Sequence, residues 1–178
     1  PTTVPLIDVR WVFPIPDQSL SVVELLPANV DTVGGSFAVG VDPFTFPQTL
    51  GELCTACVAL DGLTVPKPPF NWRDTEIASL PTDVVSVEMK TASFSLDIQN
   101  NLGFDPIRPA AANPGTMTIT VYDVDINGRE LAQVVLDGAT DALPNNMLTT
   151  VPVTLASGTV TSTILTVIDL VSPLGDTN

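Results

Sequence analysis

The sequence predicts an all-β protein, an antiparallel β-sandwich with one short helix near residues 50–60 and long Pro-rich loops. Short apolar runs alternate residue by residue and are separated by turn signals at intervals of about 8–12 residues, which is typical of sandwiches and barrels. Asn127-Gly128 lies inside one such pair of runs, residues 116–137. This dipeptide tolerates the positive φ angles of a two-residue type I′ turn, so it predicts a hairpin.

The first forty residues predict three strands. Two prolines break the first apolar run after residues 7–13, and a second strand is expected within residues 19–26 because proline cannot donate to a central ladder. Within residues 30–41, Gly34-Gly35 indicates a turn or bulge that is followed by a third strand. The first strand is expected to be half-buried, because its apolar side chains alternate with other residues: Ile7, Val9, Trp11 and Phe13.

Residues 43–80 differ from the rest, because they predict a helix and a long connection in place of strands. Thr49 stands three residues before Glu52, which is the spacing of a capping box, and Gly62 follows the apolar run where a helix often ends. The one short helix is therefore expected over residues 50–60. Three prolines then follow within four residues and forbid further helix.

Strands dominate the second half of the chain. The apolar side chains of residues 85–89 and those of residues 92–99 have opposite parity, which predicts a bulge or a strand that crosses between sheets. After the hairpin, a strand is expected to follow Asn145-Asn146 and reach Leu155. Ser157-Gly158 predicts a turn, and residues 160–171 predict one long final strand.

Composition bounds the class of protein. The chain of 178 residues has the length of one domain, so we expect a single domain over residues 1–178, with a boundary near 80/81 as the alternative. Twenty acidic and six basic residues give a net charge of -14, which argues against nucleic acid and anionic membranes as partners. No apolar run is long enough to span a membrane, and we expect no transmembrane segment. The chain is therefore expected to be soluble, either as a cytosolic protein or as a mature product whose signal or lipid-bearing segment has been removed.

The chain has no histidine, and this argues against an enzyme. Ser-His-Asp and Cys-His catalysis, histidine metal sites and the usual pH switch are all excluded. A pair such as Asp74 and Glu76 is of the type that serves a glycosidase, but twenty acids produce such pairs by chance. We expect no catalytic residues and no cofactor.

Cys54 and Cys57 form a CxxC motif that has a structural and a redox interpretation. A redox site normally lies in a βαβ unit, and a zinc site needs a second pair of ligands, and neither is present. Val58 follows the motif in place of histidine, so covalent haem attachment is excluded. We expect a local disulfide or two buried side chains, and the low proportion of charged residues favours an oxidising compartment.

Asp123, Asp125, Asn127 and Gly128 spell the opening of a calcium loop. The motif requires a bidentate acid at its twelfth position, where this chain has Val134. Since the Asn-Gly pair is already explained by the turn, a solvated face of a strand is the simpler interpretation. The sequence predicts no metal site.

The segment of residues 66–73, PKPPFNWR, is the candidate interaction surface. Three prolines stiffen it toward an extended form, which lowers the entropy lost when it docks on a partner. Phe70 and Trp72 are expected to offer apolar area, and Lys67 and Arg73 supply two of the six positive charges. The alternative is that the two rings belong to the core.

Two resemblances rest on longer stretches of sequence. Residues 92–155 contain the stretches ASFSLDIQNNLGFDPI, TMTITVYDVDINGRELA and NNMLTTVPVTL. These three stretches resemble the water-stress and LEA-2 type of β-sandwich. The second resemblance rests on the stretch LGELCTACVALDGLTVPKPPF and the later stretch VSPLGD. Together they are similar to extracytoplasmic β-sandwich proteins of Gemmatimonas-type bacteria. One protein of this kind is a membrane-extrinsic subunit of a photosynthetic reaction-centre complex. The first resemblance implies an immunoglobulin-like or LEA-2-like sandwich, and the second implies a structural clamp on a membrane complex.

These observations lead to one functional prediction and one alternative. The prediction is a non-catalytic structural or scaffolding subunit, peripheral to the extracytoplasmic side of a bacterial membrane assembly, whose partners are other proteins. Loops as long as those within residues 43–80 and 100–115 are usually functional or disordered, so the sequence predicts that they bind the partner. The alternative is a sandwich that binds carbohydrate or lipid.

Overall fold

The structure is a computed structural model and describes residues 30–33, 36–39, 45–60, 63, 65–110, 112–124 and 127–176. Every strand pair in this part of the chain is antiparallel, which confirms the all-β prediction. The helices are α1 (Leu50–Leu53) and α2 (Thr55–Val58). The strands are β1 (Val30–Val33), β2 (Ser36–Val39), β3 (Phe70–Ser79), β4 (Val87–Met89), β5 (Ala92–Asn100), β6 (Thr116–Asp123), β7 (Glu130–Asp137), β8 (Met147–Leu155), β9 (Gly158–Val160) and β10 (Thr163–Ser172).

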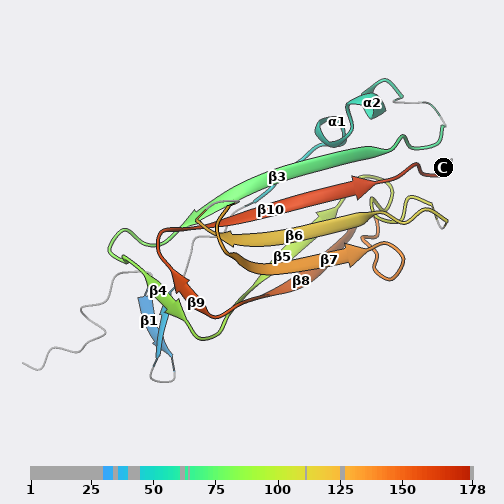
Figure 1. Ribbon diagram of the computed structural model, residues 1–178. Coiled ribbons are helices and arrows are strands. Elements are labelled where there is room, and N and C mark those ends of the chain that lie inside the picture. Colours follow the sequence, from blue (N-terminus) through green and yellow to red (C-terminus); the bar gives the residue numbers. More distant parts are fainter. Residues whose placement is uncertain are drawn as a thin grey trace, which may run out of the picture.

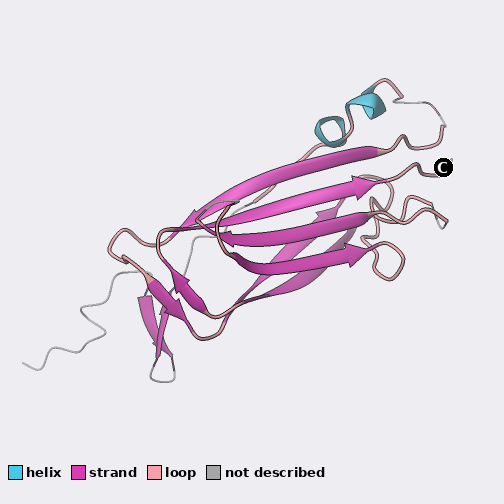
Figure 2. Ribbon diagram, viewed as in Figure 1, coloured by secondary structure: helices cyan, strands magenta, loops and turns pink. Residues whose placement is uncertain are grey.

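The strands form two layers (Figures 1 and 2). One layer is a four-stranded sheet in the order β3-β10-β6-β7, and the other contains the pairs β5-β8 and β4-β9. Alternate residues of facing strands point into the space between the layers, as the pleat of a strand requires. The core therefore combines side chains that lie far apart in sequence, such as Ile119 of β6, Val151 of β8 and Ile168 of β10.

Strand β3 was not predicted. The sequence places residues 43–80 in a helix and a connection, whereas residues 70–79 form a ten-residue edge strand whose partner is β10. The prolines end before the strand begins at Phe70, so they do not prevent it. Since β3 shares a sheet with the C-terminal strand, a domain boundary near 80/81 would cut through that sheet.

The helical prediction is correct in place and wrong in length. Thr49 Oγ1 accepts a hydrogen bond from the Glu52 N–H at 3.4 Å, and the Glu52 carboxylate accepts one from the Thr49 N–H at 2.7 Å, which is the expected capping box. Cys54 then leaves helical geometry, with φ -141° and ψ 87°, and divides the segment into α1 and α2. Gly62 lies outside the described residues.

The hairpin of β6 and β7 is present, but the register of its ladder differs from the predicted one. The ladder ends at the pair Tyr122 and Glu130, after a bulge next to Val121, so the connection is not the two-residue turn at Asn127-Gly128. Val124 takes a φ of 72°, which is unusual for a β-branched residue. Its N–H donates to the Thr163 carbonyl at 2.9 Å, and the Thr163 hydroxyl donates to the Val124 carbonyl at 3.0 Å. These two bonds hold the strained backbone in place.

The remaining strands follow the predictions with two differences. The parity change between residues 89 and 92 coincides with a break, after which the chain passes from β4, the partner of β9, to β5, the partner of β8. The predicted long strand over residues 160–171 is divided into β9 and β10. Around Gly34-Gly35 the chain forms the pair β1-β2, while the strands predicted within residues 1–26 lie outside the described residues. The described helices include none that is long and apolar enough to cross a membrane.

Candidate functional site: the disulfide end of the sandwich

One end of the sandwich collects most of the exposed large apolar side chains. We call it the disulfide end: it comprises α1, α2, the described residues between α2 and the start of β3, the start of β8, the end of β10 with the residues that follow it, and the connections 101–115 and 138–146 (Figure 1). Of the eleven large apolar side chains that are exposed in the described part of the chain, seven lie there: Val58, Leu63, Val65, Met147, Leu148, Val171 and Leu174. Apolar side chains that gather in this way mark contact sites more often than isolated ones do.

A disulfide joins Cys54 to Cys57 and ties the last turn of this helical segment together. Cys54 is only 2% exposed and packs in the core with Leu53, so the bridge anchors the segment to the sandwich. The capping box at its start lowers the pKa of Glu52, because the backbone N–H and the hydroxyl of Thr49 both donate to the carboxylate. The described surroundings of the bridge do not include the βαβ unit that a redox motif would have.

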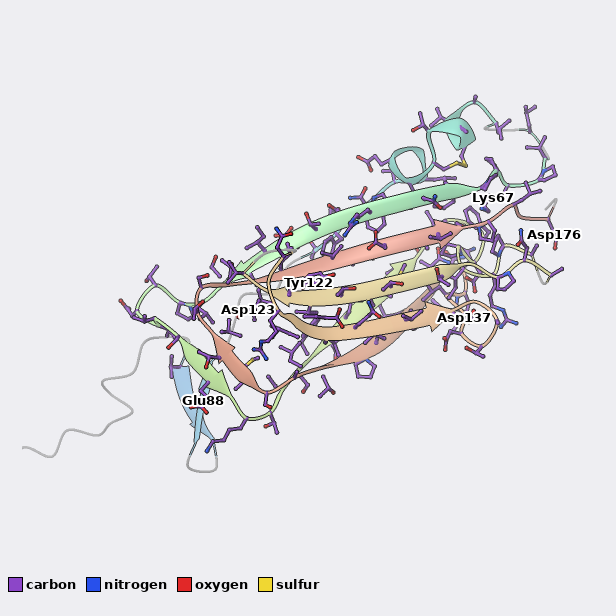
Figure 3. The ribbon with its side chains drawn as sticks, in the orientation of Figure 1. Lys67, Glu88, Tyr122, Asp123, Asp137 and Asp176 are labelled. Carbon is purple, nitrogen blue, oxygen red and sulfur yellow. A yellow bond between two sulfur atoms is a disulfide. The ribbon has the colours of Figure 1, made fainter. Side chains whose placement is uncertain are left out.

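Lys67 joins the start of β3 to the end of β10 (Figure 3). Its ammonium group donates to the carbonyls of Pro68 at 3.0 Å and Pro173 at 2.5 Å, and to the hydroxyl of Ser172 at 3.1 Å. The same group lies 4.7 Å from the centre of the Phe70 ring, as in a cation–π contact. Burial lowers the pKa of Lys67 to about 8.

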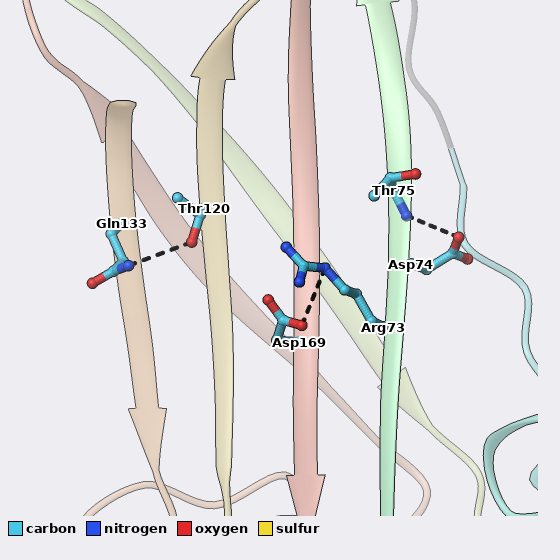
Figure 4. Close-up of polar contacts among 6 residues, drawn as sticks. All are labelled: Arg73, Asp74, Thr75, Thr120, Gln133 and Asp169. Carbon is cyan, nitrogen blue, oxygen red and sulfur yellow. Dashed lines mark hydrogen bonds and ion pairs between the residues drawn. The ribbon is translucent and has the colours of Figure 1, made fainter. Parts of the chain in front are cut away.

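The structure separates the other three predicted interaction residues. Successive side chains of a strand point to opposite faces, so Phe70 and Trp72 share the inner face of β3 while Arg73 points outward. Phe70 is 8% exposed and belongs to the core, and Trp72 is half-buried against the same cluster. The expectation that the Phe70 ring offers free surface is therefore wrong. Arg73 is exposed and pairs with Asp169 across the sheet, with 3.4 Å between Nε and Oδ1 (Figure 4).

The connections at the disulfide end are ordered by two polar residues that the sequence did not single out. Buried Asn100 donates to the carbonyls of Phe104 at 2.8 Å and Leu143 at 2.5 Å. Asp105 accepts from the N–H groups of Ile107 at 3.0 Å and Leu143 at 2.8 Å. Both residues tie the connection 101–115 to the connection 138–146.

Asp123, the first residue of the stretch that resembles a calcium loop, lies at the opposite end of the sheet from Lys67 (Figure 3). Asp123 ends β6 and is half-buried, and Asp125 lies outside the described residues. Within the described ranges, no group of three or more acidic, cysteine or histidine side chains is arranged to hold a metal ion.

A wide cleft opens between the edge strands β3 and β5 of the two layers. Its volume is about 1970 Å³, and most of its lining is apolar. Trp72 and Ala78 line it from β3, and Phe94, Leu96 and Ile98 line it from β5. Serine and threonine hydroxyls and a few carboxylates lie among these side chains, and none of them forms a nucleophile–base pair with a histidine, because the chain has none.

The geometry thus defines a β-sandwich with an ordered, apolar-rich end and an open side. No protein-family model, curated protein or solved structure matches the chain. The similarity to LEA-2 type sandwiches and to reaction-centre subunits therefore remains a prediction from the sequence.

Proposed function

We propose that this chain is a non-catalytic structural subunit that binds other proteins of a bacterial membrane assembly on its extracytoplasmic side. The observation that carries the proposal is the gathering of seven exposed large apolar side chains at the disulfide end. A protein-protein contact buries such side chains behind a polar rim. The second sequence resemblance suggests a photosynthetic complex as one assembly of this kind.

The construction of this end supports a binding role. Its segments are held by a disulfide, by the Lys67 hydrogen bonds and by the hydrogen bonds of Asn100 and Asp105. Segments that are already ordered lose less entropy when they bind, so more of the contact energy appears as affinity. A disulfide also suits an oxidising compartment outside the cytoplasm.

Co-purification from native membranes tests the proposal. The tagged chain is expected to recover a membrane assembly in stoichiometric amount, and the double variant Val58→Asp, Leu63→Asp is expected to weaken that recovery at least tenfold, because hot-spot residues each contribute about 2 kcal/mol or more. Val85→Asp is the matched control, since Val85 is 85% exposed but lies in the connection between β3 and β4 at the other end of the sandwich.

Two results would overturn the proposal. In one, the double variant recovers the assembly as well as the wild-type chain does, which would move the contact surface elsewhere. In the other, the wild-type chain is recovered as a free monomer that binds sugars or lipids, which would favour the alternative class of function.

A further inference from the structure

The helix α2 depends on contacts outside itself to keep its shape. It is a single turn, Thr55–Val58, in which all four residues are described and none is buried. One isolated turn is unstable in water, because the first hydrogen bond of a helix returns less free energy than fixing its residues costs. Contacts with the rest of the molecule must therefore hold α2 in place.

The bridge between Cys54 and Cys57 ties α2 to the core (Figure 3). Cys54 is 2% exposed and belongs to the core cluster, and Cys57 is half-buried and packs against the same cluster. The chain turns back between the two helices, so that a Cβ on Gly51 of α1 would lie 3.1 Å from Cγ2 of Val58. In one continuous helix these two residues would lie about 10 Å apart along the axis. The bridge thus fixes α2 beside α1.

The segment that the bridge fixes carries part of the exposed apolar surface of the disulfide end. Val58 is 61% exposed, and Leu63 and Val65, between α2 and β3, are 62% and 37% exposed. The neighbouring segments have supports of their own. The capping box holds α1, Lys67 joins the start of β3 to the end of β10, and Asn100 ties the two connections together. Opening the bridge would therefore loosen α2 and the residues after it, and leave the rest of this end in place.

We propose that the Cys54–Cys57 bridge is a redox switch of this surface: the chain binds its protein partner when the bridge is formed and loses affinity when the bridge is reduced. The inference rests on the proposed function, because it takes Val58 and Leu63 as contacts with a partner. A disulfide restricts the open conformations of the segment that it closes. Without the bridge, α2 has to be ordered at the moment of binding, and this entropy loss is subtracted from the affinity.

The burial of the two cysteines sets the order of the exchange with a dithiol reductant. Cys57 is half-buried and Cys54 is shielded, so a thiolate of the reductant attacks Cys57 Sγ. The S–S bond breaks, and its electron pair leaves on Cys54 Sγ, which takes up a proton. The second thiolate of the reductant then attacks its own sulfur in the mixed disulfide and releases Cys57, which is also protonated. The chain gains two electrons and two protons, and the reductant becomes a disulfide; a disulfide oxidant closes the bridge by the reverse steps.

Amide hydrogen exchange of the full-length chain, with and without reduced dithiothreitol, tests the conformational part. The Cys57 N–H donates to the Cys54 carbonyl at 2.9 Å, and the Leu60 N–H donates to the Cys57 carbonyl at 3.1 Å. Both amides should exchange about tenfold faster after reduction. The Gly138 N–H, which donates to the Gly115 carbonyl at 2.9 Å, is the control and should keep its rate. A bridge that dithiothreitol opens only in denaturant, or unchanged exchange at Cys57 and Leu60 after reduction, would overturn the proposal.

Co-purification from native membranes tests the binding part. The double variant Cys54→Ala, Cys57→Ala takes the place of added reductant, so that disulfides of the assembly itself stay intact, and protection of its Gly138 amide shows that it remains folded. It should recover about tenfold less of the assembly than the oxidised chain does.

The outcomes separate the switch from the proposed function. Equal recovery by the oxidised chain and the variant without the bridge would overturn the switch. The proposed function would then stand if Val58→Asp, Leu63→Asp still weakens recovery in the same membranes. Failure of the oxidised wild-type chain to recover any assembly would overturn the proposed function, and the switch with it.

Discussion

Gly138 is a position in the described part of the chain where one added methyl group should be strongly destabilising. It follows β7 at the disulfide end, where its N–H donates to the Gly115 carbonyl at 2.9 Å. The Gly115 N–H in turn donates to the Ile107 carbonyl at 2.7 Å. A Cβ on Gly138 would lie 1.8 Å from the Ile107 oxygen and 2.7 Å from its carbonyl carbon. Both are backbone atoms, so no side chain can rotate away.

The cost of Gly138→Ala follows from these contacts. Relief requires the backbone at Ile107 to move, although the side chain of this residue is fully buried in the core. Overpacking of this kind costs about 1–3 kcal/mol, and loss of the hydrogen bond to Gly115 adds about 1 kcal/mol. We therefore expect the free energy of unfolding to fall by about 2–4 kcal/mol.

Gly103→Ala is the matched control. Gly103 has a φ of 85°, but a Cβ there would meet no atom within 4 Å, so the substitution tests backbone strain without a clash. Its cost should be about 1 kcal/mol. Urea unfolding of the oxidised proteins, compared at equal m-values, measures both changes. A Gly138→Ala variant no less stable than Gly103→Ala would refute the close approach of the connections at this end.

Three further predictions concern other parts of the chain. Val124→Gly should raise the free energy of unfolding by about 1 kcal/mol in urea titrations, because glycine relieves the positive φ; an unchanged midpoint would contradict the strain. The pKa of Lys67 is about 8 in the folded state, below its usual value, so the unfolded chain binds more protons above pH 8. The Tm of the wild type relative to Lys67→Met should therefore rise with pH from about 8 to 10, and a difference that stays constant over this range would contradict the lowered pKa. Thiol labelling of the denatured, unreduced protein should find no free thiol, and two would contradict the bridge between Cys54 and Cys57.

Strands whose inner faces are apolar can be predicted from the sequence, whereas β3 cannot, because its inner face is partly polar. Its inner face carries Trp72, Asp74, Glu76 and Ala78, so the apolar alternation is interrupted by two carboxylates. An edge strand beside an open cleft permits this, because its carboxylates keep access to water and polar groups. Asp74, for example, accepts a hydrogen bond from the Gln48 side chain at 3.0 Å. Periodicity alone cannot distinguish such a strand from a polar loop.

The hairpin of β6 and β7 shows a second limit of prediction from local sequence patterns. Asn127-Gly128 correctly placed β6 and β7 next to each other, but the ladder stops short of it at Tyr122 and Glu130. The hydrogen bonds between Val124 and Thr163 draw the chain toward β10 at this point. A contact with a strand almost forty residues away overrides the local preference of the dipeptide, and the sequence carries no local signal of it.

The disulfide end was predicted in part. The cysteine pair and the capping box are local patterns, and both were recognised from their spacing. The role of Lys67 was not, because its acceptors Ser172 and Pro173 are more than a hundred residues away in sequence. Phe70 was assigned to a surface because it follows three prolines, whereas its burial depends on the neighbouring strand β10 and on Phe104, whose ring centre lies 6.5 Å from its own.

The hydrogen bonds that hold the connections at the disulfide end also help to keep its apolar side chains exposed. A loosely held loop that carried Leu63 or Met147 would gain free energy by folding these side chains back onto the sandwich. Asn100 and Lys67 oppose such a collapse, because moving the connections would leave buried donors and acceptors without partners, at a cost of about 1–3 kcal/mol each. The exposed side chains thus lie on a frame that resists closing over them, which supports the proposal that a protein partner covers them.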